Sequence, residues 1–176
     1  RSAKRLLYLC PCISISDNMA LLIRCRDISP QFGQNCFFAE NATIIGDVVM
    51  GDECSVWFQA VVRGDVNFIR IGNKVNIQDG AILHATYQKC GTTIGNNVSI
   101  GHRALVHGCT LHDNVLVGMG AIIMDQAVVE ENCLIAAGAV VLENTVCETG
   151  GVYAGVPARR VKELTPDLFQ GQIERI

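Results

Sequence analysis

The hydrophobic residues in the central part of the chain recur every six positions. An aliphatic or aromatic residue opens each unit, and a small or β-branched residue follows four positions later. Three extra residues precede the unit at position 71, a five-residue insertion precedes position 94, and one residue is missing before position 111. The opening residues are Phe38, Ile44, Met50, Val56, Val62, Ile71, Ile77, Leu83, Ile94, Ile100, Val106, Leu111, Val117, Ile123, Val129, Ile135 and Val141.

A six-residue phase held over this length does not fit the helical period of 3.6 residues, and it predicts one short strand and one turn in each unit. Three units form one triangular coil, and successive coils stack at the strand spacing of about 4.8 Å. Because side chains alternate along a strand, the opening residues face the core and their successors face outward. Residues 38–157 are therefore predicted to form an all-β parallel β-helix, preceded by a lead-in segment over residues 19–37.

The two ends of the chain lie outside the repeat. We expect residues 1–18 to be a loose extension, because their apolar run is short and no small-residue cleavage site follows it. Charged residues surround Val161, Leu164 and Leu168, a pattern typical of a helix. Residues 158–176 are thus predicted to form a C-terminal α-helix that is interrupted or restarted at Pro166 and packs on the solenoid.

Composition narrows the classes of function. Of the 176 residues, 49% are hydrophobic and 18% charged, as expected of one globular domain. The net charge is −3 and no basic block could neutralise a row of phosphates, which argues against nucleic acid as a partner. No window approaches the roughly 18 apolar residues of a membrane span. Nine cysteines without a C-x-x-C pair favour free thiols in a reducing compartment such as the cytoplasm.

The repeat places two histidines in one vertical column. The residues that open one face in successive coils are Val62, Leu83 and Val106. Their successors Arg63, His84 and His107 should therefore point outward, one above the other. Two imidazoles one coil apart can share a metal ion that takes nitrogen ligands at about 2.0 to 2.1 Å.

A third histidine, His102, lies on the preceding face. It is five residues from His107, and an extended chain covers roughly 3.3 Å per residue, so His102 is too distant to share their metal within one chain. A neighbouring subunit could supply it, because a head-to-tail interface closes into a ring when the rotation allows. For a three-sided prism, we expect a homotrimer with interfacial zinc sites.

An ordered set of short motifs resembles the γ-class carbonic anhydrase family. The motifs are Val62-Arg-Gly-Asp65, Asn76-Ile-Gln-Asp-Gly80, Leu83-His84, Ile100-Gly-His102, Val106-His-Gly-Cys-Thr110 and Tyr153-Ala-Gly-Val-Pro-Ala158. The resemblance covers roughly residues 27–162. It implies a left-handed β-helix and a trimer in which His84 and His107 of one subunit and His102 of the next bind zinc, with iron as the alternative metal.

The resemblance also implies a reaction. Zinc lowers the pKa of a bound water from about 15.7 to about 7, which provides hydroxide to convert CO2 to bicarbonate. By resemblance, Gln78 would hydrogen-bond the zinc-bound water or bicarbonate, Asn76 would orient that amide, and Tyr153 would line the site. The residues that look like the family's interface ion-pair set are Arg63, Asp65 and Asp79.

Two departures keep other functions open. Val66 stands where the best-characterised active members carry a carboxylate, and the insertion over residues 85–93 lacks an acid that could carry protons away. The alternatives are a hexapeptide acyltransferase that uses coenzyme A and a histidine general base, and a metal-stabilised structural or assembly subunit with little activity. A thioesterase-like zinc hydrolase is a variant of the last.

Overall fold

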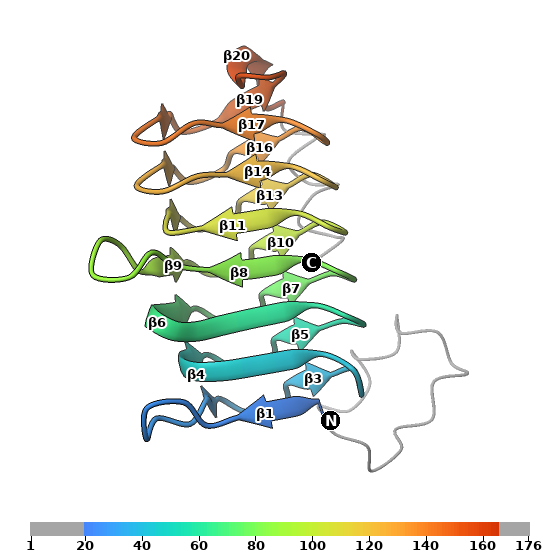
Figure 1. The fold of residues 1–176 in the computed structure, drawn as a ribbon. Helices are drawn as coiled ribbons and strands as arrows, with labels where there is room; N and C mark the ends of the chain where they lie inside the picture. The colour runs from blue at the N-terminus through green and yellow to red at the C-terminus, as the bar shows by residue number, and fades with distance from the viewer. Residues whose placement is uncertain (1–19, 166–176) are drawn as a thin grey trace.

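The computed structural model describes residues 20–165, which form a three-sided parallel β-solenoid (Figure 1). The first side contains β1 (Leu21–Ile23), β4 (Thr43–Met50), β6 (Val61–Ile71), β8 (Ile82–His84), β11 (Leu105–His107), β14 (Ile122–Ile123) and β17 (Val140–Val141). The second contains β2 (Gln31–Phe32), β9 (Thr92–Ile94), β12 (Thr110–Leu111), β15 (Val128–Val129) and β18 (Val146–Cys147). The third contains β3 (Phe37–Phe38), β5 (Ser55–Val56), β7 (Asn76–Ile77), β10 (Ser99–Ile100), β13 (Leu116–Val117), β16 (Leu134–Ile135), β19 (Gly151–Ala154) and β20 (Arg159–Glu163).

The rungs pair in parallel and in register. Strands β4 and β6 run around one corner without a break, which joins the first and second sides into a 12-stranded sheet. The third side is a separate 8-stranded sheet. Strands β1 and β2, from the lead-in segment, pair with β4. No helix long and apolar enough to cross a membrane occurs among residues 20–165.

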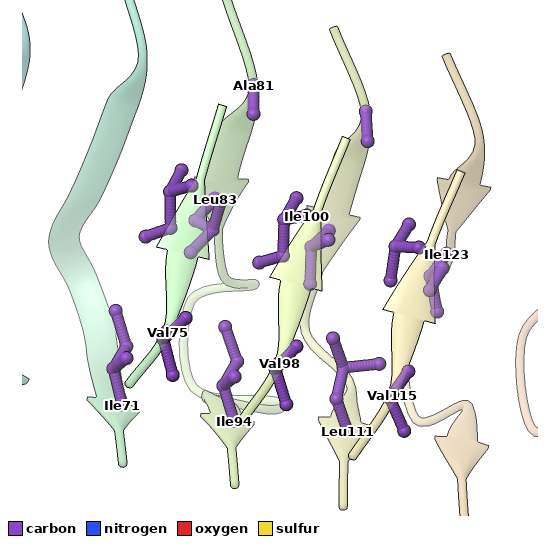
Figure 2. Packing of buried hydrophobic residues seen from close by; sticks show 14 of the residues in the cluster. Ile71, Val75, Ala81, Leu83, Ile94, Val98, Ile100, Leu111, Val115 and Ile123 are labelled. Atoms are coloured by element: carbon purple, nitrogen blue, oxygen red, sulfur yellow. The ribbon is translucent and has the colours of Figure 1, made fainter. Parts of the chain in front are cut away.

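The core consists of the side chains that the repeat turns inward. The opening positions are buried except Phe38, which is half-buried and packs against the core. Figure 2 shows such residues aligned from rung to rung, with Ile71, Ile94 and Leu111 in one row and Val75, Val98 and Val115 in another. The cluster also contains the thiols of Cys54 and Cys133. Stacking like residues on like lets each rung bury its apolar face against its neighbours, which one rung cannot do alone.

One inward position departs from the repeat. Val66 stands four residues after Val62, yet it is only half-buried, and Ile69 is fully buried in the same strand. The three extra residues lie at the corner where β4 and β6 bend, and the pairing of these strands shifts register there. The inward alternation resumes after the shift, because Ile69 then lies opposite Val48.

The predicted C-terminal α-helix is wrong for the residues that the structure describes. Arg159–Glu163 is strand β20, which pairs antiparallel with β19. The last rung would otherwise present an unpaired sheet edge, and the turn over residues 155–158 returns the chain along it. Backbone pairing thus outweighs a helical side-chain pattern. Leu168 and the rest of residues 166–176 lie outside the described residues, as does the extension over residues 1–18.

Candidate metal centre

Two imidazoles lie one above the other on the outside of the first side. β8 and β11 pair so that His107 is directly opposite His84, as the repeat predicts. The Nδ1 atom of His84 is 3.0 Å from the Nε2 atom of His107. Both side chains are largely covered, with 15% and 29% of their surfaces exposed.

Each imidazole is held by a carboxylate through its other nitrogen. His84 Nε2 donates to Asp65 Oδ1 at 3.1 Å, and His107 Nδ1 donates to Asp125 Oδ1 at 2.6 Å. A neutral imidazole carries one proton, so these bonds leave a lone pair on each of the two nitrogens that face each other. Two lone pairs at 3.0 Å repel unless a cation, either a proton or a metal ion, shares them.

This donor set fits zinc. Two tetrahedral zinc ligands at about 2.0 to 2.1 Å from the metal are about 3.3 Å apart, close to the observed separation of 3.0 Å. Carboxylates that orient ligand histidines from the far nitrogen are typical of zinc sites. Within residues 20–165, one chain brings together no group of three His, Cys, Asp or Glu side chains that could hold a metal. The described residues of one chain therefore offer two nitrogen donors, and a metal ion held there would need further ligands from outside them.

The charge state of these groups suits metal binding. Burial lowers the pKa of His84, which favours the neutral, ligating form. Desolvation raises the pKa of Asp65, but hydrogen bonds from Arg63 and His84 outweigh it, and the net pKa is lowered. Desolvation is likewise outweighed at Asp125, where hydrogen bonds from Thr86, His107 and Lys89 hold the pKa well below its usual range. The centre thus has two stacked imidazoles, each backed by a carboxylate.

The structure separates His102 from this pair. It follows β10 on the third side, and its Nδ1 atom lies 3.0 Å from Asp79 Oδ2. The side chains of His102 and Asp79 are about half exposed, at 46% and 44%. Arg63 also belongs to an ion pair, because its guanidinium donates to Asp65 Oδ2 at 2.7 Å. The predicted ion-pair residues therefore brace the histidines: Arg63 and Asp65 at His84, and Asp79 at His102.

The three predicted substrate-side residues all lie on or beside the third side. Asn76 Oδ1 accepts hydrogen bonds from Ser55 Oγ and Trp57 Nε1, at 3.1 and 2.9 Å. Gln78 follows β7 one rung below the segment that carries His102, because Ile77 pairs with Ile100. Tyr153 is buried in the last rung, and its hydroxyl accepts a hydrogen bond from the Glu148 amide at 2.7 Å.

An apolar column borders the histidines on the first side. The outward residues two positions before His84 and His107 are Ile82 and Leu105, and Ile82 is 44% exposed. Ile122 and Val140 continue this column towards the C-terminus. Leu142 adds further exposed apolar surface at 43%. A sheet side with outward aliphatic residues around a polar pair is typical of an interface between subunits.

Comparison with known proteins settles the family. The sequence matches the families described as "Bacterial transferase hexapeptide (six repeats)" over residues 108–143 and "Hexapeptide repeat of succinyl-transferase" over residues 91–124. It is 48% identical over 148 residues to a carbonic anhydrase of Geobacillus kaustophilus, covering 84% of this chain and 80% of that protein. It is 52% identical over 134 residues to a probable carbonic anhydrase of Methanocaldococcus jannaschii, covering 76% and 84%. The chain belongs to the γ-carbonic anhydrase-like family of hexapeptide-repeat proteins.

The solved structures agree on the fold. A hexapeptide transferase family protein from Anaplasma phagocytophilum superimposes with a TM-score of 0.84 at 38% identity, covering 88% of this chain and 91% of that one. The γ-carbonic anhydrase-like scaffold is thus shared with proteins named as transferases. The histidine pair, rather than the scaffold, must distinguish the possible functions.

Sequence reasoning missed one part of this γ-carbonic anhydrase-like centre. Asp125 binds His107, and Thr86 and Lys89 from the insertion bind Asp125. The repeat gave only a partial signal, because the coil from Val106 to Ile123 has 17 residues and therefore places Met124 opposite His107, with Asp125 as the next residue. The fold of the insertion back onto that carboxylate has no comparable signal in the repeat.

Proposed function

We propose that this chain is a zinc-dependent carbonic anhydrase that converts CO2 and water reversibly to bicarbonate and a proton at the interfaces of a homotrimer. The observation that carries the proposal is the pair of imidazole nitrogens, 3.0 Å apart, whose lone pairs face each other. Zinc, when bound, supplies a water whose pKa is lowered to about 7 and so a hydroxide nucleophile at neutral pH. Iron is the alternative metal, and the left-handed winding comes with the family.

In this proposal the chain's own residues have distinct tasks. His84 and His107 hold the ion, and Asp65 and Asp125 fix the rings so that the ligating nitrogens point at it. Holding the ion therefore requires only these carboxylates and imidazoles of one subunit. A second subunit would supply a further nitrogen ligand and the groups that contact the substrate.

The third side of a neighbouring subunit is suited to that task. His102 and Asp79 pair with each other at its corner, and Gln78 precedes Asp79 directly. A subunit that brings His102 to the ion therefore also brings the Gln78 amide, which we propose hydrogen-bonds the substrate. Asn76, two residues earlier in the chain, would orient that amide. A three-sided prism that joins a first side to a third side makes a head-to-tail contact, and such contacts close into a ring when the rotation between subunits allows. The apolar column of the first side would be buried there.

Tyr153 lies far from the residues that would meet the substrate. Tyr153 lies on β19, whereas β10, which precedes His102, is separated from it by β13 and β16. Its hydroxyl already bonds the Glu148 amide. We therefore propose a packing role for Tyr153 in the last rung.

We propose that buffer carries the proton released in the reaction away from the site, because the residues at 66 and 85–93 include no acid.

One experiment tests the reaction. CO2 hydration is followed by stopped flow for zinc-loaded wild type and for His107→Ala, alongside metal analysis and mass in solution. We expect a zinc-dependent rate, about one metal per chain, a trimer mass, and loss of both metal and rate in His107→Ala. A well-folded wild type that is monomeric and binds no metal would reject the interfacial centre.

A second candidate is a hexapeptide acyltransferase, which the similarity to the Anaplasma hexapeptide transferase family protein favours. Such an enzyme needs one histidine base and no metal. Acetyl transfer from acetyl-coenzyme A by metal-free protein would support it. A trimer that binds zinc but hydrates CO2 no faster than His107→Ala would instead favour a structural or assembly subunit, or a zinc hydrolase of thioesters. The free cysteines suit a reducing compartment such as the cytoplasm.

A further inference from the structure

The insertion over residues 85–93 folds back onto the metal centre. It leaves the first side directly after His84 and returns as β9. A bridge between Thr86 and Cys90 closes its base. The tip of the insertion is exposed. Three side chains of the insertion, those of Thr86, Lys89 and Thr92, nevertheless form hydrogen bonds with groups around the histidines.

Two of these side chains bind the carboxylate behind His107. Thr86 Oγ1 donates to Asp125 Oδ2 at 2.6 Å, and Lys89 Nζ donates to the same oxygen at 3.1 Å. The other oxygen, Oδ1, accepts the proton of His107 Nδ1 at 2.6 Å. Asp125 is 7% exposed, so water can hardly replace these donors. Its carboxylate therefore has one oxygen fixed by the insertion and one oxygen that fixes the imidazole.

The third side chain ties the two histidine backbones together. Thr92 is fully buried, and its Oγ1 donates to the His84 carbonyl at 2.5 Å. The same oxygen accepts the Gly108 amide at 3.0 Å, directly after His107. This bridge fixes the distance between the two backbones, whereas Thr86 and Lys89 fix the orientation of one ring.

We infer that Thr86 and Lys89 are positioning residues, which act through Asp125 to aim His107 Nε2 at the ion. The inference rests on the proposed metal centre and concerns a part of the chain to which the resemblance gives no role beyond a missing acid. Thr86 and Lys89 are two hydrogen bonds away from the ligand nitrogen and cannot donate an electron pair to the metal ion. Their effect must therefore come from restricting the orientation of the His107 ring. Removing the direct partner of a ligand, here Asp125, typically weakens metal binding by about 10- to 100-fold. Thr86 and Lys89 stand one hydrogen bond further out, so their removal should weaken binding by about tenfold, the lower end of that range.

The test uses the full-length chain and measures Zn²⁺ affinity by competition with a chromophoric chelator. The disruptive variant Thr86→Val/Lys89→Met keeps the side-chain volumes but removes both donors. The conservative variant Thr86→Ser/Lys89→Arg keeps them. The control Thr93→Val/Lys74→Met makes the same kinds of change at two exposed side chains. The absorption spectrum of the Co²⁺-loaded proteins reports the geometry around the ion.

We expect the disruptive variant to bind Zn²⁺ about tenfold more weakly and to show a changed Co²⁺ spectrum, with the conservative and control variants within about threefold of wild type. The inference is overturned if the disruptive variant matches wild type in both measurements while His107→Ala loses the metal. If wild type binds no Zn²⁺, the proposed function fails, and the inference with it. Should the double variant fail to fold, Lys89→Met alone changes a side chain that is 40% exposed and decides the matter in the same way.

Discussion

The close packing at Gly101 gives the sharpest test of how the third side is built. A Cβ atom at this position would lie 2.8 Å from Met119 N, 2.9 Å from Val117 O and 3.0 Å from Gly118 C, all backbone atoms of the next rung. Ordinary contacts of a Cβ begin at about 3.4 Å, so Gly101→Ala must push the rungs apart by about 0.6 Å. No flexible side chain can absorb this displacement.

The expected cost follows from the strained contacts. Overpacking of this kind costs about 1 to 3 kcal/mol. The same shift stretches the 2.8 Å hydrogen bond from the Gly101 amide to Val117 O, whose loss costs about 0.5 to 1.5 kcal/mol. Alanine also lowers the conformational entropy of the unfolded chain, which offsets about 0.4 to 1 kcal/mol of this loss of stability. We therefore expect Gly101→Ala to lower the free energy of unfolding by about 0.5 to 4 kcal/mol, with about 2 kcal/mol as the central value, and to displace His102, the next residue.

Urea unfolding at fixed protein concentration measures this loss. The matched control is Gly120→Asn, because Gly120 has a φ of 64° and open space around its Cβ position. Asn114 and Asn132 already adopt this conformation, each with a φ of 59°. The control should stay within about 0.5 kcal/mol of wild type. A Gly101→Ala protein as stable as the control would refute the packing argument.

Three further predictions concern the core and the charged groups. Leu111→Ala removes a fully buried side chain and should cost about 2 to 5 kcal/mol of unfolding free energy, measured by the same urea titration. Burial raises the pKa of Cys109 to about 12, so iodoacetamide at pH 7.5 should leave Cys109 unmodified in native protein, as peptide mapping by mass spectrometry will show. The lowered pKa of Asp125 stabilises the fold above the unfolded value of about 3.9, and this contribution disappears as the pH falls through the folded value. Wild type should therefore lose more stability between pH 6 and pH 2.5 than Asp125→Asn, and equal losses would contradict that role.

Much of the fold could be predicted because each six-residue unit repeats the same local pattern of one short strand and one turn. The inward facing of Leu83 and Val106 and the stacking of His84 over His107 follow from strand alternation and coil length alone. Periodicity carries this information without any knowledge of distant contacts. The resemblance was needed only for the handedness and for the roles expected of Gln78, Asn76 and Tyr153.

The remainder depended on contacts that a periodic pattern cannot encode. At the corner of β6 the inward-facing position moves from Val66 to Ile69, because the extra residues are accommodated in the bend of the strand. The charged pattern of Arg159–Glu163 favoured a helix, but the free edge of β19 selected a strand. Gly101 has no positive φ, so the lack of space beside the next rung, rather than its backbone conformation, requires a glycine there.

The antiparallel direction of β20 bears on how the stack of coils ends. Parallel rungs offer the same edge at every level, so nothing in the repeat itself limits its length, and an uncovered last rung could template a further chain. By reversing direction, Arg159–Glu163 converts that edge into one on which the next parallel rung has no matching pattern of donors and acceptors. These five solvent-facing residues form the outermost layer of the part of the chain that the structure describes. Strand β20 thus ends the stack of parallel rungs and hinders its extension into a fibre.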